Sequence, residues 1–291
     1  MLARRVGAFE VLRYRFRNER ASPLTLIYNI PQVQFSRLVG DVTRFMCGAD
    51  TKSMLEIYDK YPPRNVTPNG MVVPKRNRIL EYNLVVKSFS AIIEGMGISD
   101  LIESWHIPLN VRFKSSEVSS LNMSRAHPTE HPHSDSWAGE SSESVTVHIP
   151  IMGDWENNYV QMFYPDGEFK EDWLGPRKSY ADGQDLLPHY SPINYVTPLG
   201  SLALMDFATL HASTRRPNCG PRVSIDTTFV LKKEGMSEKI HQWRENERAS
   251  DEVLRGIGEK YLFYFPDSPD VQVDTKGGFK HPTNLVVKNL D

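Results

Sequence analysis

The spacing of apolar residues in the first hundred positions predicts a mainly helical region with one short strand. Residues 77–97 carry apolar side chains at a helical period and end at Gly95 and Gly97, a common signal for the end of a helix. Residues 24–31, LTLIYNIP, are typical of a short strand that ends at a proline. A second helix is predicted over residues 34–46, from the spacing of Phe35, Leu38, Val39, Val42 and Phe45.

The pattern changes between residues 106 and 232. Short runs rich in Val, Ile, Thr, Tyr and Phe are separated by clusters of Gly, Pro, Asn and Asp, which is typical of an all-β sandwich or barrel. The predicted strands are LNVRF, SLNMS, SVTVHIPIM, NYVQMFY, SLALMDF and RVSIDTTFVL. After residue 233, charged segments with a helical pattern return, followed by a tail rich in Pro and Gly. We therefore expect one domain over residues 1–291, with a helical region (1–105), a β core (106–232) and C-terminal helices with a tail (233–291).

Composition narrows the class of protein. The 34 basic and 36 acidic residues give a formal net charge of −2, which argues against nucleic-acid binding and against a membrane-surface protein. Apolar runs are too short to span a bilayer. Two distant cysteines, Cys47 and Cys219, do not suggest a disulfide framework, so a cytoplasmic location is expected. The Arg-rich start only faintly resembles a transit peptide, because it lacks Ser enrichment and contains Glu10. The oligomeric state stays open.

Metal-capable side chains alternate in the stretch EHPHSDSW, at His131, His133 and Asp135. In a strand, residues two apart face the same side, so His133 and Asp135 could bind one divalent cation together. Nine histidines and 36 acidic residues in 291 positions give about one such His-x-acid pair by chance. The pair therefore needs support from other residues.

That support comes from residues 198–231. A turn at Gly200 is followed by an apolar run that ends near His211, and the turn cluster RRPNCGP leads into RVSIDTTFVL. The last segment alternates, so Arg222 and Ser224 share its polar face. A guanidinium can donate two parallel hydrogen bonds to a carboxylate, so this face is a good receptor for a carboxylate.

Taken together, His133-x-Asp135, His211 and Arg222-x-Ser224 resemble the Fe(II)/2-oxoglutarate-dependent dioxygenases, in particular the phytanoyl-CoA-hydroxylase-like or natural-product-pathway branch. The resemblance covers roughly residues 106–232. It implies a double-stranded β-helix, that is, a cupin-like jelly-roll, with helices at both ends. It also implies Fe(II) on His133, Asp135 and His211. The 1-carboxylate and 2-oxo group of 2-oxoglutarate would chelate the iron, and the 5-carboxylate would meet Arg222 and Ser224.

The family resemblance implies an enzyme that uses dioxygen to oxidise, most simply to hydroxylate, a small-molecule metabolite and that releases succinate and CO₂. In the halogenating branch a small residue replaces the acidic ligand, so Asp135 argues for hydroxylation. The residues expected to line a substrate or co-substrate pocket are Asn122, Arg125, Trp137, His148 and Gln161. For His148, which is in phase with Thr146, a hydrogen-bonded core position is the alternative.

Two other interpretations remain open. A cupin-type metalloprotein would use three histidines and one glutamate, namely His131, His133, His211 and Glu140. The long gap to Glu140 and the presence of Arg222 beside Ser224 count against it. The second is a jelly-roll binding protein without catalysis, which would lack the absorption band near 500 nm that the family's iron chelate gives.

Overall fold

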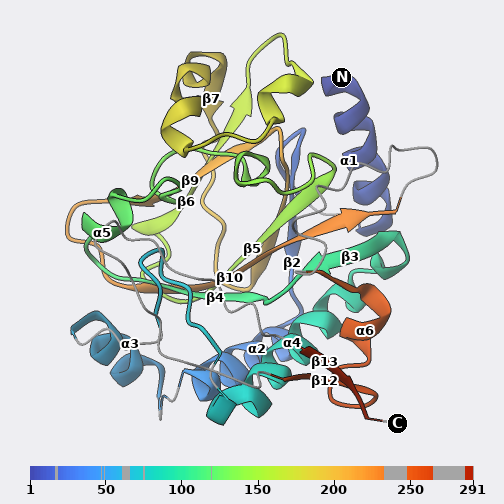
Figure 1. The fold of residues 1–291 in the computed structure, drawn as a ribbon, viewed down its shortest axis with the longest axis vertical. Coiled ribbons are helices and arrows are strands. Elements are labelled where there is room, and N and C mark those ends of the chain that lie inside the picture. Colours follow the sequence, from blue (N-terminus) through green and yellow to red (C-terminus); the bar gives the residue numbers. More distant parts are fainter. Residues whose placement is uncertain are drawn as a thin grey trace.

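The computed structural model describes residues 1–16, 19–46, 48, 50–60, 66–74, 76–118, 120–232, 248–264 and 286–290. Figure 1 shows a β core with helices packed against one side and along one edge. The helices are α1 (Leu2–Phe16), α2 (Gln32–Phe45), α3 (Thr51–Lys60), α4 (Ile79–Gly95), α5 (Ser120–Met123) and α6 (Asp251–Arg255). Short 3₁₀ helices are η1 (Arg76–Arg78), η2 (Ser99–Leu101), η3 (Asp135–Ala138), η4 (Glu171–Leu174) and η5 (Tyr180–His189). No helix in these ranges is long and apolar enough to cross a membrane.

Two antiparallel sheets form the core. The order of the major sheet is β1 (Arg20–Ser22), β2 (Thr25–Asn29), β8 (Ser201–Asp206), β5 (Ser144–Gly153), β10 (Arg222–Leu231), β3 (Ile102–His106) and β11 (Arg248–Ser250). A further strand, β4 (Asn110–Lys114), also pairs with β10. The order of the minor sheet is β7 (Tyr190–Pro192), β6 (Asn158–Pro165) and β9 (Leu210–Arg215). The fold class predicted from the sequence, a jelly-roll core with flanking helices, is confirmed.

Alternation along β5 and β10 separates the core from the interior of the barrel. Val147, Ile149 and Ile225 are fully buried in the main hydrophobic cluster, together with Val85 and Phe89 of α4. The apolar face of the major sheet thus packs on the helices, as side chains of period two require. The intervening polar side chains of both strands point the other way, into the cavity described below.

Two predictions of local structure differ from what the structure shows. SLNMS, predicted as a strand, contains the helical turn α5. Ser and Asn side chains favour helix ends and turns over strand interiors, because they hydrogen-bond to the nearby backbone. Where C-terminal helix and tail were predicted, the described residues form α6 but also β11, β12 (Tyr261–Tyr264) and β13 (Val286–Asn289). β11 pairs with β3, and β12 pairs with β13, so strand pairing overrides the helical pattern of the local sequence. Residues 233–247 lie outside the described part.

The N-terminal helix is joined to the core through Arg5. Its Nη1 donates to both carboxylate oxygens of Asp206 at 2.8 and 2.9 Å, and its Nη2 donates to Glu171 at 2.8 Å. Burial raises the pKa of Asp206, and the nearby Arg5 opposes that rise. Arg5 therefore compensates a carboxylate that would otherwise be buried without a counter-charge.

Replacing Arg5 by Met should lower the free energy of unfolding by about 3–5 kcal/mol, the usual cost of leaving one partner of a buried ion pair uncompensated. Urea unfolding of both proteins measures the loss. Arg4→Met is the matched control, because the Arg4 side chain is 54% exposed and its nearest carboxylates lie 3.6 Å away. Its loss should stay below about 1 kcal/mol. Equal losses in the two variants would contradict this role of Arg5.

Candidate metal centre

His133 and His211 are brought together by their own backbones. Each donates its backbone N–H to the carbonyl of the other, at 3.0 and 2.9 Å, in an isolated antiparallel bridge beside β9. The two imidazole centroids are consequently 4.3 Å apart. His211 therefore lies at the start of β9, in the minor sheet, and not at the end of the apolar run of β8.

Asp135 completes the cluster, although not by strand alternation. The sequence predicted that His133 and Asp135 share one face of a strand, but Asp135 is the first residue of η3, after Ser134 caps that turn. The turn still directs Asp135 Oδ1 to 3.7 Å from Nε2 of both histidines. Thr146 of β5 donates a hydrogen bond of 2.8 Å to the other oxygen, Oδ2. Thr146 therefore holds the carboxylate while Oδ1 faces the two imidazoles.

The protonation state of His133 suits a metal ligand. Its Nδ1–H donates to the carbonyl oxygen of His131 at 2.7 Å, so the lone pair is on Nε2, toward Asp135 and His211. Burial, and then the nearby His211, lower the pKa of His133 well below its usual value, which keeps the ring neutral. The ring of Tyr180 stacks on His133 at 4.0 Å between centroids. Hydrogen bonding and stacking together fix the ring orientation.

The three donor atoms fit a divalent transition metal. One atom each from His133, Asp135 and His211 lies within 4.8 Å of the others, and this is the one such group of three among the residues described. Two imidazoles and one carboxylate are the donor set of the facial triad that holds non-haem Fe(II) and leaves other positions open. The donors approach from the minor sheet and from η3, so the opposite side of the cluster faces the cavity.

The cavity beside this cluster has a volume of about 1090 Å³, including its open mouth. Arg222 and Ser224 of β10 line it, and each is only 1% exposed. Arg222 Nη1 lies 3.2 Å from Nε2 of His148. The Nε atom of Arg222 has no hydrogen-bond partner among the described residues. Burial, and then repulsion from Arg215, lower the pKa of Arg222 to about 9. A buried cation in this state is a receptor for an anion.

Five further residues were predicted to line the pocket, and the structure places two of them there, Arg125 and His148. The other three point elsewhere. The Asn122 amide donates to Glu130, the indole N–H of Trp137 donates to the carbonyl of Trp173 at 2.7 Å, and the Gln161 amide donates to the carbonyl of Ile193 at 2.9 Å. Glu130, Trp173 and Ile193 all lie outside the cavity lining, although the Asn122 carbonyl also accepts a hydrogen bond of 3.3 Å from the lining residue Arg125.

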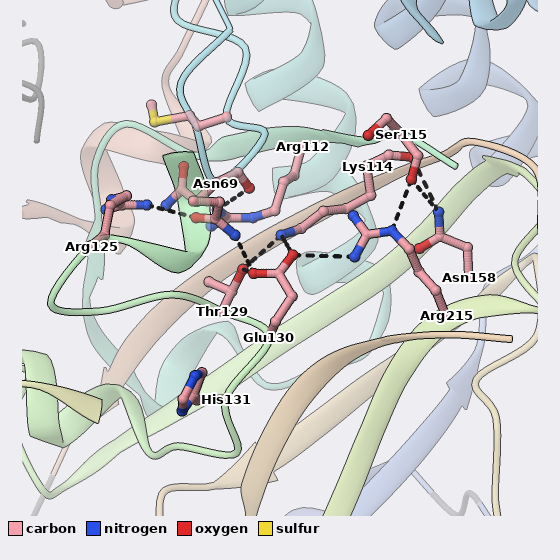
Figure 2. A network of polar contacts seen from close by, with 12 residues as sticks. Asn69, Arg112, Lys114, Ser115, Arg125, Thr129, Glu130, His131, Asn158 and Arg215 are labelled. Atoms are coloured by element: carbon pink, nitrogen blue, oxygen red, sulfur yellow. Dashed lines mark hydrogen bonds and ion pairs between the residues drawn. The ribbon is translucent and has the colours of Figure 1, made fainter. Parts of the chain in front are cut away.

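The cupin set of ligands is not assembled. Glu140 Oε2 accepts a hydrogen bond of 2.6 Å from Arg248 Nη2, and Glu140 does not belong to the group of metal-capable residues. Only the backbone carbonyl of His131 takes part, through its bond to His133. In Figure 2 the His131 ring stands apart from the polar network around it.

The sequence did not predict a charged network next to the loop that carries His133 and Asp135, which Figure 2 shows. Glu130, three residues before His133, accepts hydrogen bonds from Lys114 and Arg215, both at 3.2 Å. Lys114 also donates to Thr129 at 2.6 Å. Lys114 is the last residue of β4 and Arg215 the last of β9, so the network joins the two sheets beneath the loop. The signal in the sequence is weak, because Lys114 only follows the predicted strand LNVRF and Arg215 opens the predicted turn cluster RRPNCGP.

Two more residues of the cavity were missed. Tyr180 stacks on His133, and Arg112 of β4 binds both oxygens of Asp226 on β10, at 2.7 and 2.6 Å. Arg112 and Lys114 are two residues apart on the same strand, so alternation could have placed them together. Their partners come from distant parts of the chain and could not be read from spacing.

Comparison with known proteins gives structural likenesses only. No protein-family model matches the sequence, and no curated protein matches it significantly. Similar solved structures include the non-heme alpha-ketoglutarate-dependent epimerase SnoN from nogalamycin biosynthesis, at 13% identity over 77% of this chain and 83% of that chain, with a TM-score of 0.42. The alpha-ketoglutarate-dependent carbocyclase SnoK from the same biosynthesis is 12% identical over 81% and 90%, with a TM-score of 0.40.

EctD from S. alaskensis, solved with 2-oxoglutarate and 5-hydroxyectoine, is 12% identical over 76% of this chain and 78% of that chain, with a TM-score of 0.38. At such identities and TM-scores, the roles of individual residues rest on the geometry of this chain.

The Lys114 network generates a prediction about pH. Burial lowers the pKa of Lys114 to about 7, although Glu130 opposes the shift. Above pH 7 the unfolded chain keeps a proton that the folded chain has lost, so this group makes the folded state more stable as pH rises toward 10.5. Its contribution is at most about 1.4 kcal/mol per pH unit.

Urea unfolding between pH 7.5 and 9.5 tests this. The stability of the wild-type protein should rise relative to that of Lys114→Met by about 2 kcal/mol across the window. Lys87→Met, which removes a lysine from an exposed ion pair with Glu259, controls for the loss of one charge. Parallel curves for the wild type and Lys114→Met would show that Lys114 stays protonated.

Proposed function

We propose that the protein is a non-haem Fe(II)/2-oxoglutarate-dependent oxygenase that hydroxylates a small-molecule metabolite and releases succinate and CO₂. The observation that carries the proposal is one cavity in which His133, Asp135 and His211 converge beside the buried cation Arg222. A metal triad alone would suit several classes of protein. A separate carboxylate receptor in the same cavity favours a co-substrate with a free carboxylate.

Each residue has a role in this proposal. His133, Asp135 and His211 would hold Fe(II), which, with 2-oxoglutarate bound, supplies the activation of dioxygen for oxidation of a C–H bond. Arg222 would donate to the distal carboxylate of 2-oxoglutarate, with the hydroxyl of Ser224 beside it. Thr146 keeps Asp135 oriented, and the neutral tautomer of His133 keeps a lone pair available.

The lining of the cavity supports a small, polar substrate. Asn69, Arg125 and His127 line it together with the site residues, and a few convergent polar groups of this kind orient a small ligand. Hydroxylation is the simplest outcome, because Asp135 occupies the acidic position of the triad, where the halogenating branch of the family that the sequence resembles carries a small residue.

The first test compares His211, a proposed ligand, with His131, which lies two residues before His133. His211→Ala should abolish succinate release and greatly weaken Fe(II) binding, because one of three ligands is lost. His131→Ala should leave both nearly unchanged, since only its backbone carbonyl is used. Anaerobic Fe(II) titration and a succinate assay with a metabolite panel measure the two properties. Loss of both properties in His131→Ala as well as in His211→Ala would instead support the cupin set, and full activity in His211→Ala would show that the proposed triad is wrong.

The second test separates co-substrate from metal. Arg222→Ala should weaken 2-oxoglutarate binding at least about thirtyfold, because truncating a buried charge pair costs roughly 2–5 kcal/mol. Fe(II) affinity should stay the same. Arg222→Lys should recover only part of the loss, because an ammonium lacks the planar fork. Arg216→Ala, at an exposed position between β9 and β10, is the control. Normal 2-oxoglutarate binding in Arg222→Ala would move the receptor elsewhere, with Arg125 next.

A binding protein without catalysis is distinguished by the same titrations. Anaerobic addition of Fe(II) and 2-oxoglutarate should produce the absorption band near 500 nm that the family's chelate gives. Its absence in the wild-type protein would contradict the proposed function.

A further inference from the structure

Arg222 is bound differently from other buried arginines of the chain. Arg5 donates to Asp206 and Glu171, and Arg112 donates to both oxygens of Asp226. In those cases a carboxylate of the protein neutralises the guanidinium. The hydrogen-bond partner of Arg222 is an imidazole, that of His148 on β5.

The imidazole of His148 is neutral and acts as an acceptor. His148 is 5% exposed, and burial, followed by the charge of Arg222, lowers its pKa well below the usual value. Arginine has donors only, so Nε2 of His148 must accept from Arg222 Nη1. The proton of the neutral ring is then on Nδ1, which has no hydrogen-bond partner in the described structure.

The carboxylate of Asp226, beside this pair, is already used. Asp226 is the cross-strand neighbour of His148 in the register of β5 and β10. Its two oxygens accept from Arg112, and Oδ2 also accepts from Asn110 at 3.1 Å. Those hydrogen bonds, with the charge of Arg112, lower the pKa of Asp226 against the effect of its burial. Asp226 thus balances Arg112, and the charge of Arg222 remains available in the cavity.

We propose that His148 is a positioning residue that determines the class of 2-oxo acid the cavity accepts. A neutral acceptor orients the guanidinium of Arg222 without neutralising it, so the compensating charge must come from the ligand. The cavity would then select 2-oxo acids with a second, distal carboxylate over those with an apolar end. A carboxylate at position 148 would instead pair with Arg222 and exclude the ligand's own carboxylate. This inference rests on the proposed function, since it assigns the ligand of Arg222 to the co-substrate.

Three substitutions separate orientation from charge. His148→Gln keeps a neutral acceptor, His148→Glu has nearly the same size but adds a negative charge, and His148→Leu removes the acceptor. Binding of 2-oxoglutarate and of 2-oxovalerate, in which a methyl group replaces the distal carboxylate, is measured by anaerobic calorimetry with Fe(II) present. Fe(II) affinity and thermal unfolding of each variant are measured alongside.

The wild-type protein should prefer 2-oxoglutarate strongly. His148→Gln should retain its affinity to within about threefold, and His148→Leu should lose about tenfold, the size of one hydrogen bond to a charged group. His148→Glu should lose at least about thirtyfold and bind the two acids almost equally, with Fe(II) affinity unchanged. The contrast between His148→Gln and His148→Glu is the decisive result. If position 148 acted only through packing, the loss of affinity in His148→Glu would not depend on whether the ligand carries a distal carboxylate.

Wild-type preference and affinity in His148→Glu would overturn the inference while leaving the proposed function intact. So would equal losses for both acids in His148→Gln and His148→Glu, because position 148 would then act through packing. A wild-type protein that binds neither acid with Fe(II) would overturn the proposed function together with the inference.

Discussion

The two-residue alternation of β5 and β10 is the constraint on which the rest of the structure depends. These strands are neighbours in the major sheet, so their side chains of like phase form two continuous surfaces. One surface is apolar and is buried by α2 and α4, and the other carries Thr146, His148, Arg222 and Ser224 into the cavity. A shift of one residue in the register would exchange the two surfaces, so the packing of the core also fixes the position of the site.

Charged side chains buried inside the barrel need partners, and most of those that the structure describes pair with a side chain of opposite charge. Asp226 is committed to Arg112, and Glu130 is shared by Lys114 and Arg215. These pairs compensate charges that burial would otherwise make costly. Arg222 is the exception, because a neutral imidazole supports it. An uncompensated cation lowers the stability of the empty protein and is retained where a ligand supplies the missing charge.

Much of this arrangement could be predicted from the sequence. The alternation in RVSIDTTFVL correctly indicated the strand and the phase that places Arg222 and Ser224 on one polar face. His133, Asp135 and His211 were selected through spacing and family resemblance, and the structure brings them together. The reason given for His133 and Asp135 was wrong in detail, because a 3₁₀ turn and not a strand joins them.

What the sequence could not supply were partners distant along the chain. Glu130 and Arg215 are 85 positions apart, and Arg112 and Asp226 are 114 apart. Nothing in local spacing links such residues, since their proximity follows from the pairing of whole strands. The same reason explains why Asn122 was predicted wrongly as a pocket residue. It lies close to the site along the chain, but its amide donates to Glu130 and it does not line the cavity.

The contacts that anchor the loop carrying His133 and Asp135 share a property that bears on the proposed metal site. His133 is oriented by a backbone carbonyl, Asp135 by the hydroxyl of Thr146, and the preceding Glu130 by Lys114 and Arg215. None of these contacts uses Nε2 of His133 or requires Oδ1 of Asp135. The ligands are therefore fixed through atoms that do not compete with a metal, so binding needs little rearrangement of the loop. The charged network fixes the start of the loop at Glu130, which does not line the cavity, so the network does not occupy the space proposed for the substrates.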